Sequence, residues 1–275
     1  MRCFKNVLIA DLKRFWNLSW KLYAIFCVYC ILQASLFYSN IYKLIIKGKI
    51  MSISLGEALM DFFKGAKEFY PDGNTPMDVP IFEIFMLLYL LFIIAYYVNK
   101  DRSALGRSIM ISSKSPVYWW ISKYITTFVA TFVYMVIIVI THVACGWIIL
   151  CKHFICRMIF TSESNIKYLL KTEAIKFNTN IMILIGLILL CLVTASSIML
   201  FIAYISNAVF GFIINIILFI ISICYMKWIC IYNFMMMYRI PQVYNQWHLG
   251  AGLMTIINVL IMVIGIMYSK RKDFL

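Results

Sequence analysis

Residues 179–205 read TNIMILIGLILLCLVTASSIMLFIAYI and contain no charged side chain. A helix needs about 20 mostly apolar residues to cross the roughly 30 Å of hydrocarbon in a bilayer. The apolar residues here are continuous and do not alternate with polar ones, which favours a helix over a membrane strand. This stretch therefore predicts a transmembrane helix.

Five other stretches have a similar length and hydropathy. The six predicted spans are Leu22–Tyr38, Ile81–Val98, Ile121–Leu150, Thr179–Ile205, Ala208–Cys230 and Gly250–Tyr268. Over the whole chain 64% of the residues are hydrophobic and 13% are charged, whereas a soluble domain is about half apolar and about a quarter charged. The expected fold class is all-α, a polytopic membrane protein whose single membrane domain covers residues 1–275.

Residues 1–21 have the pattern of an amphipathic helix. Apolar side chains recur at helical spacing, and most of the Lys and Arg side chains lie off that stripe. The stripe consists of Phe4, Val7, Leu8, Leu12, Phe15 and Trp16. We expect an interfacial helix that lies on the membrane before the first span; a frayed basic tail is the alternative.

The distribution of Lys and Arg predicts the orientation. If the N-terminus is cytoplasmic, the inner segments carry 13 of these residues within 52 positions and the outer segments carry 12 within 93. Cytoplasmic loops are enriched in Lys and Arg, so both termini are expected in the cytoplasm. The formal net charge is +14, and the cationic residues flank apolar runs. This placement indicates contact with membrane lipid and not with nucleic acid.

This orientation places two long loops, 39–80 and 151–178, on the outer side. Residues 51–70 of the first loop predict an amphipathic helix, with Ser54 and Glu57 at capping-box spacing and a turn at Pro71-Asp72-Gly73. The expected apolar face consists of Leu55, Ala58, Leu59, Phe62, Ala66 and Phe69. Residues 161–178 show a weaker version of this pattern.

The sequence lacks the motifs of several enzyme classes. Gly48-Lys49 is followed by Ile50 and has no upstream glycine, so it is not a P-loop. The three histidines, at 142, 153 and 248, each stand alone and form no HExxH motif. We expect no enzyme activity in this chain and no metal or cofactor bound by it.

The nine cysteines lie mostly in or beside apolar runs. Cys27 and Cys30 form a CxxC within a predicted span, without a second CxxC to complete a metal site, and are interpreted as small apolar helix residues. Cys151 and Cys156 lie near one span end, where a disulfide is an open alternative.

Three residues are candidates for a substrate path, because ionisable and polar groups within spans often mark one. Glu83 opens the second span, Tyr89 follows it, and His142 lies deep in the third. The alternatives are a Glu83 at the membrane interface and a neutral His142 bonded to a neighbouring helix. Of the 11 acidic residues, only Glu83 falls within a predicted span.

The cytoplasmic loop 99–120, with the first turn of the next span, reads NKDRSALGRSIMISSKSPVYWWISK over residues 99–123. It combines positive charge with a small apolar face, as a helix that docks into a partner's groove would. The expected contact residues are Asp101, Arg102, Leu105, Arg107, Ile109, Met110 and Lys114. The alternative is an ordinary basic loop that sets the topology.

The order of these elements resembles that of the ABC-2-type transporter permeases, the membrane subunits of many bacterial ABC exporters. That family has an interfacial N-terminal helix, six spans and a coupling helix between spans two and three. The stretch LGRSIMISSKSPVYWWISKYI resembles the family's short helix, Ser/Thr-Pro turn and Lys opening span three, at Gly106–Ser113, Ser115-Pro116 and Lys123. The tail YSKRKDFL and a tight turn at Ser206-Asn207 also match, whereas loops 39–80 and 151–178 are longer than the family pattern.

The resemblance implies an exporter permease in the bacterial cytoplasmic membrane, with two copies of a separate ATPase that bind ATP and Mg and dock on the coupling loop. It also implies a second permease, as homodimer or heterodimer, with spans two and five at the interface. Related small permeases serve lantibiotic or bacitracin-like peptide export and immunity, so an amphipathic peptide- or lipid-like substrate is expected. The alternatives are a stand-alone toxin- or lipid-binding immunity protein and a secondary transporter.

Overall fold

The computed structural model describes residues 2–67, 69, 79–102, 115–162, 165, 168–169, 180–239 and 243–271, with the backbone alone at 2, 3, 102 and 271. The described helices are α1 (Arg2–Ile46), α2 (Leu55–Phe62), α3 (Ile81–Arg102), α5 (Pro116–Leu150), α7 (Ile181–Ile205), α8 (Ala208–Cys224) and α10 (Trp247–Arg271). The short elements are β1 (Ile53–Ser54), β2 (Phe154–Ile155) and the 3-10 turns η1 (Cys151–His153), η2 (Ile231–Met235), η3 (Met237–Arg239) and η4 (Tyr244–Gln246).

The protein is an all-α membrane protein. Among the described residues, five segments are long and apolar enough to cross a bilayer. They are Phe4–Ile46, Ile81–Asp101, Pro116–His153, Ile181–Ile205 and Tyr244–Lys270. The predicted fifth span, Ala208–Cys230, is helical only to Cys224, and its 17 residues reach about 25 Å at 1.5 Å per residue. Five of the six predicted spans thus lie in helices of the required length. The helix of the predicted fifth span, α8, is shorter.

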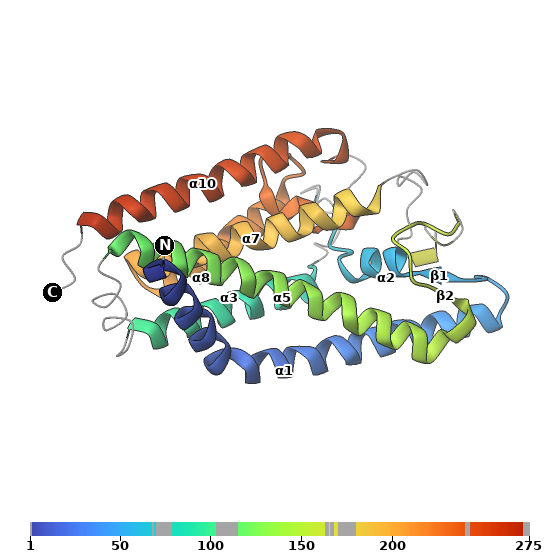
Figure 1. Ribbon diagram of the computed structural model, residues 1–275. Coiled ribbons are helices and arrows are strands. Elements are labelled where there is room, and N and C mark those ends of the chain that lie inside the picture. The colour runs from blue at the N-terminus through green and yellow to red at the C-terminus, as the bar shows by residue number, and fades with distance from the viewer. Residues whose placement is uncertain are drawn as a thin grey trace.

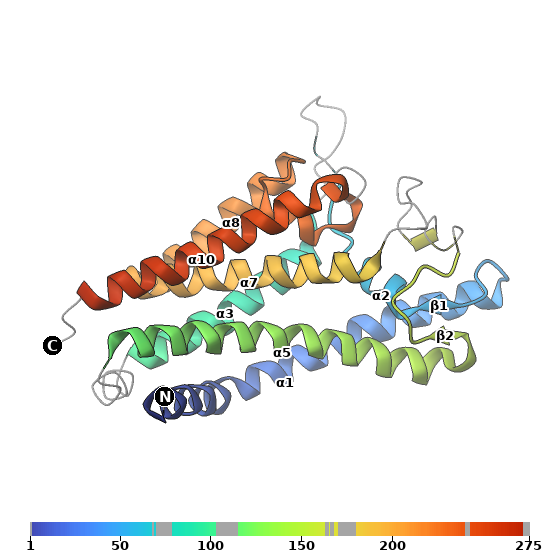
Figure 2. The same ribbon diagram turned by 45° about the horizontal axis from the view of Figure 1, so that its top comes forward.

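The helices run back and forth along one axis, and α1 starts at the same end of the bundle where α10 finishes (Figures 1 and 2). α1 packs along α5, and α7 contacts α3, α5, α8 and α10. Many side chains on the outer faces of α1, α8 and α10 are both exposed and apolar, as lipid-facing residues are. Examples are Leu32, Leu36, Ile213, Ile217, Leu260 and Val263.

The predicted interfacial helix over 1–21 and the predicted span over 22–38 belong to one continuous helix. α1 is one helix of 45 residues, and its first part runs at an angle to the rest (Figure 1). Val7 and Phe15 of this first part are buried, whereas Trp16 is half exposed. This first part contacts both α3 and α5: the Phe15 ring centroid lies 5.1 Å from that of Tyr97, and Asp11 pairs with Lys123. The helix also extends to Ile46, eight residues into the predicted outer loop.

Local sequence signals mark the start of α5 and the turn between α7 and α8. Pro116 is the first residue of α5 and follows an extended Ser115, because proline suits the first helical position and disfavours helix before it. The predicted span Ile121–Leu150 therefore lies within α5, which begins five residues earlier. α7 ends at Ile205 and α8 begins at Ala208, with the Asn207 side chain accepting a hydrogen bond from the Val209 N–H. The tight turn predicted at Ser206-Asn207 is confirmed.

The capping box at the start of α2 is also confirmed. The Ser54 hydroxyl accepts from the Glu57 N–H at 3.1 Å, and the Glu57 carboxylate accepts from the Ser54 N–H at 2.8 Å. Glu57 is buried and also accepts from the N–H and the hydroxyl of Thr161. α2 ends at Phe62, earlier than the predicted helix over 51–70, and Pro71-Asp72-Gly73 lies outside the described residues.

Buried Arg239 holds the end of α8 against the segment after α2. Its guanidinium donates to the carbonyls of Ala66 and Lys67 at 3.0 and 3.1 Å. It also donates to the carbonyls of Ser222 and Ile223, in the last turn of α8. These last carbonyls have no helical N–H partner, and a cation at a helix C-terminus satisfies them.

We expect Arg239→Met to lower the thermal unfolding temperature of the purified chain in detergent, with a loss of at least about 3 kcal/mol, because several buried carbonyls lose their donor. Arg239→Lys retains the charge but loses the planar fork, so it should recover only part of that loss. The control is Arg157→Met at an exposed arginine. Equal unfolding temperatures for R239M and R157M would contradict this role.

Candidate functional site

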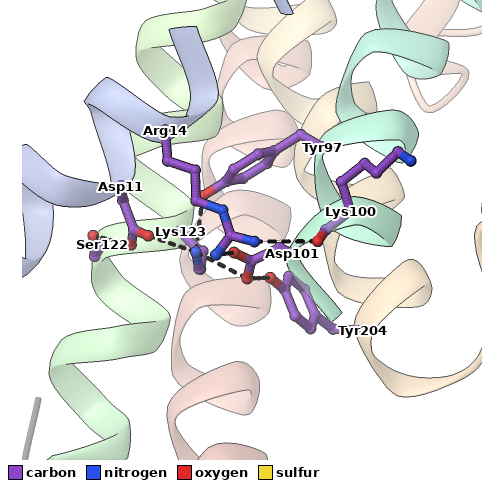
Figure 3. Close-up of polar contacts among 8 residues, drawn as sticks. All are labelled: Asp11, Arg14, Tyr97, Lys100, Asp101, Ser122, Lys123 and Tyr204. Carbon is purple, nitrogen blue, oxygen red and sulfur yellow. Dashed lines mark hydrogen bonds and ion pairs between the residues drawn. The ribbon is translucent and has the colours of Figure 1, made fainter. Parts of the chain in front are cut away.

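A cluster of four charged side chains lies buried at the end of the bundle where α1 begins (Figure 3). Asp11 and Lys123 are 0% exposed and Asp101 is 1% exposed, while Arg14 is 15% exposed. The Lys123 Nζ lies 2.6 Å from Asp11 Oδ1 and 3.0 Å from Asp101 Oδ2. Arg14 Nη1 lies 2.7 Å from Asp101 Oδ1. Two carboxylates and two cations therefore balance in charge.

Three hydroxyl groups add hydrogen bonds to these charges. The Ser122 hydroxyl donates to Asp11 at 2.5 Å, and the Tyr204 hydroxyl donates to Asp101 at 3.0 Å. Lys123 donates to the Tyr97 hydroxyl at 2.9 Å. Taking ions out of water costs several kcal/mol per ion, and this cost is offset only when the remaining donors and acceptors are also paired.

The cluster connects four helices because helical spacing puts its members on facing sides. Asp11 and Arg14 are three residues apart on α1, and Tyr97 and Asp101 are four apart on α3, so each pair shares one helix face. Lys123 comes from the second turn of α5, and Tyr204 comes from the end of α7. Figure 3 shows the side chains converging from these helices on Lys123 and Asp101.

The predicted coupling loop lies between two of these helices. α3 ends at Arg102 and α5 begins at Pro116, so the connecting segment is shorter than the predicted 99–120. Leu105, Arg107, Ile109, Met110 and Lys114 lie outside the described residues, as does the Arg102 side chain. Asp101 is described, and its carboxylate points inward to Lys123 and Arg14, so it is not an exposed docking charge in this structure.

Two of the three predicted substrate-path residues line one cavity. Glu83 and His142 both border a cavity of about 430 Å³ at the other end of the bundle, near α2. Tyr89 lies outside it: its hydroxyl donates to the Leu22 carbonyl at 2.8 Å, and its ring stacks on Phe26. The expectation that His142 bonds to a neighbouring helix is wrong, because neither ring nitrogen has a hydrogen-bond partner among the described residues.

Sequence reasoning missed the charge cluster. Asp11 and Asp101 lie outside the predicted spans, yet both belong to the long apolar segments Phe4–Ile46 and Ile81–Asp101. A signal was present: Asp11 falls at four-residue spacing between Val7 and Phe15, on the apolar stripe. A carboxylate on an apolar helix face needs a buried partner, and Lys123 supplies it from 112 residues away.

No protein-family model matches the chain, and no curated protein or solved structure matches it. Within the described part of the chain, no three His, Cys, Asp or Glu side chains are grouped so that they could hold a metal ion. The thiols of Cys151 and Cys156 are both free. The class of protein defined by the structure is a multi-pass α-helical membrane protein with a buried, charge-balanced cluster at one end and a cavity at the other.

We expect Lys123→Met to destabilise the fold by about 3–5 kcal/mol, because it leaves two buried carboxylates facing Arg14 alone. Asp11→Asn together with Lys123→Met restores the charge balance and should recover part of the loss, as a double-mutant cycle would measure. Unfolding can be followed in detergent with a thiol-reactive dye, since Cys30, Cys145 and Cys191 are buried and free.

The matched control for Lys123 is Lys13→Met, which removes an exposed lysine from the same helix as Asp11. An equal shift in unfolding temperature for K13M and K123M would show that the cluster does not hold the helices together.

Proposed function

We propose that the chain is the membrane permease subunit of an ATP-driven exporter, and that it moves an amphipathic peptide- or lipid-like substrate out of a bacterial cell. A separate ATPase, in two copies, binds ATP and Mg and supplies the energy. Both chain termini lie in the cytoplasm, and the membrane is the bacterial cytoplasmic membrane.

The observation that carries this proposal is the position of the charge cluster. Asp101 is one residue before the end of α3, and Lys123 is in the second turn of α5, so the two flank the basic segment 103–114. Asp11 and Arg14 connect the first part of α1 to both. A partner that moves segment 103–114 would therefore move three helices together, as a rigid-body mechanism requires.

The course of the helices supports a six-pass topology with α8 as the fifth span. α8 leaves the α7 end at Asn207 and finishes at Cys224, where Arg239 connects it to residues 66–67 on the α2 side. Its direction is thus opposite to that of α7, although it is only 17 residues long. An even number of passes puts the start of α1 and the end of α10 on one side, as both ribbon views have them.

A second permease, identical or different, is part of the proposal. The outer faces of α3 and α8 expose large apolar side chains that suit either lipid or a second subunit. They include Phe82, Phe85, Phe92, Val209, Phe210 and Ile213. Phe219 of α8 belongs instead to the core of this chain, since it is 3% exposed and its ring centroid lies 5.4 Å from that of Tyr232.

The test is purification of the tagged chain from native membranes in a gentle detergent, followed by mass spectrometry and an ATP hydrolysis assay. A near-stoichiometric P-loop ATPase with hydrolysis is the expected result. A single chain without ATPase, in a detergent that preserves such complexes, would contradict the proposal.

Charge reversal at the connecting segment tests where the ATPase docks. We expect Arg102→Glu with Arg107→Glu to weaken ATPase co-purification at least ten-fold, because docking depends on the basic character of this segment. Lys47→Glu with Lys49→Glu makes the same charge change at exposed positions beyond α1, at the other end of the bundle, and should leave the ATPase bound. Unchanged co-purification and transport in R102E/R107E would remove the segment from the mechanism.

The same purification distinguishes the exporter from two other functions. A secondary transporter is favoured by the buried carboxylates Asp11, Asp101 and Glu83, since ion-coupled transport uses such groups. A stand-alone immunity protein that binds a toxin or lipid would also purify without an ATPase. Loss of transport in Glu83→Gln, in a chain with no ATPase partner, would select the secondary transporter.

A further inference from the structure

The cavity at the α2 end of the bundle lies between α1, α2, α3 and α5. Its volume is about 430 Å³, within the range of about 300–1,000 Å³ common for small-molecule sites. Aromatic and charged side chains line it, chiefly Tyr29, Phe37, Phe62, Glu83, His142 and Tyr238.

His142 is the member that needs a ligand most. Its side chain is 1% exposed, and neither Nδ1 nor Nε2 has a hydrogen-bond partner among the described residues. Its ring packs edge-on against Phe62, with centroids 4.9 Å apart, and against Tyr38 at 5.9 Å. A buried polar group without a partner is costly, and a polar group of a molecule in the cavity would satisfy it.

The charged groups at the cavity wall favour a cation. Asp61 and Glu83 both line it, and Lys64 is the cation among the described lining residues. The Lys64 ammonium is already engaged, because it donates to the Leu169 carbonyl at 2.7 Å and lies 3.6 Å from Asp61. Glu83 accepts a hydrogen bond from the Gly65 N–H at 2.5 Å, which fixes its carboxylate at the wall.

The ionisation of Asp61 is coupled to the presence of a cation in the cavity. Burial raises the pKa of the Asp61 carboxyl, and the nearby Lys64 ammonium opposes part of that rise. Burial thus disfavours the charged carboxylate. A second cation in the cavity would stabilise the ionised form, and the ionised form would in turn stabilise the bound cation.

The aromatic walls suit the body of such a ligand and its charge. The aromatic residues Phe37, Phe62 and Tyr29 line the cavity. A cation over an aromatic face gains about 0.5–2 kcal/mol when it is desolvated, and flat or apolar groups pack well against rings.

We propose that this cavity binds a primary organic amine with a flat or apolar body, with the ammonium placed against Glu83 and Asp61 and hydrogen-bonded to His142. The rings of Phe37, Phe62 and Tyr29 surround the apolar part. Binding of this kind needs no ATPase, so the site can be tested separately from the exporter function.

The experiment measures binding of radiolabelled tryptamine to the purified full chain in lipid nanodiscs, with empty nanodiscs as the background. Two competitors share the indole body: 3-ethylindole is neutral, and indole-3-propionate is an anion. We expect saturable binding that unlabelled tryptamine displaces and the two competitors displace at least ten-fold less effectively.

Variants connect the binding to the cavity. His142→Phe keeps an aromatic ring among aromatic neighbours but removes both nitrogens, and Glu83→Gln removes one charge. Each should weaken tryptamine binding at least ten-fold, while His248→Phe at an exposed histidine should leave it unchanged. Thermal unfolding of each variant identifies any that fails to fold, and H142F carries the test if E83Q does not fold.

Binding no greater than that of empty nanodiscs would overturn the proposal. So would equal affinity in H142F, E83Q and the unaltered chain, because the amine would then lie elsewhere. Displacement by indole-3-propionate as effective as by tryptamine would show that the cavity does not select a cation. None of these results depends on whether an ATPase co-purifies.

Discussion

The buried ammonium of Lys123, between the carboxylates of Asp11 and Asp101, is the interaction on which the arrangement of the helices depends. Each of these groups would be too costly to bury alone. Together with Arg14 they form a neutral set in which each charged group has a partner, and this is possible only when α1, α3 and α5 meet in one register. Apolar contacts alone would let these helices slide past one another, because lipid and neighbouring helices are similarly apolar. The buried ion pairs prevent such a change of register.

The same three helices also form the cavity at the opposite end. α3 carries Glu83 near its start, at the cavity, and Asp101 near its end, in the cluster, 18 residues or about 27 Å away at 1.5 Å per residue. α5 carries Lys123 and His142, and α1 carries Asp11 and Phe37. Between the two ends the helices are joined by close packing: the rings of Phe26 and Tyr134 stack with centroids 3.8 Å apart, and the Tyr134 hydroxyl donates to the Met86 carbonyl. A shift of one of these helices at the charge cluster would therefore also move its residues at the cavity.

The features predicted correctly from the sequence are local ones. The capping box of Ser54 and Glu57 and the turn at Ser206-Asn207 depend on residues a few positions apart. Errors occurred where a distant contact decides. The first part of α1 continues into the span and packs on α3 and α5, and α8 ends at Cys224, where Arg239 binds its last carbonyls. For the candidate site, Glu83 and His142 were recognised as unusual polar residues, but not as neighbours in one cavity.

The sequence by itself determined that this chain crosses a membrane, because long apolar runs have no other favourable environment and their backbone groups must pair within helices. It also determined several helix ends, through residues that cap or stop a helix locally. Only the tertiary structure decided which charged side chains meet. Asp11 and Lys123 are 112 residues apart, and the local sequence around either residue does not identify the other as its partner. The packing of α1 against α5 brings this pair together and leaves both side chains 0% exposed.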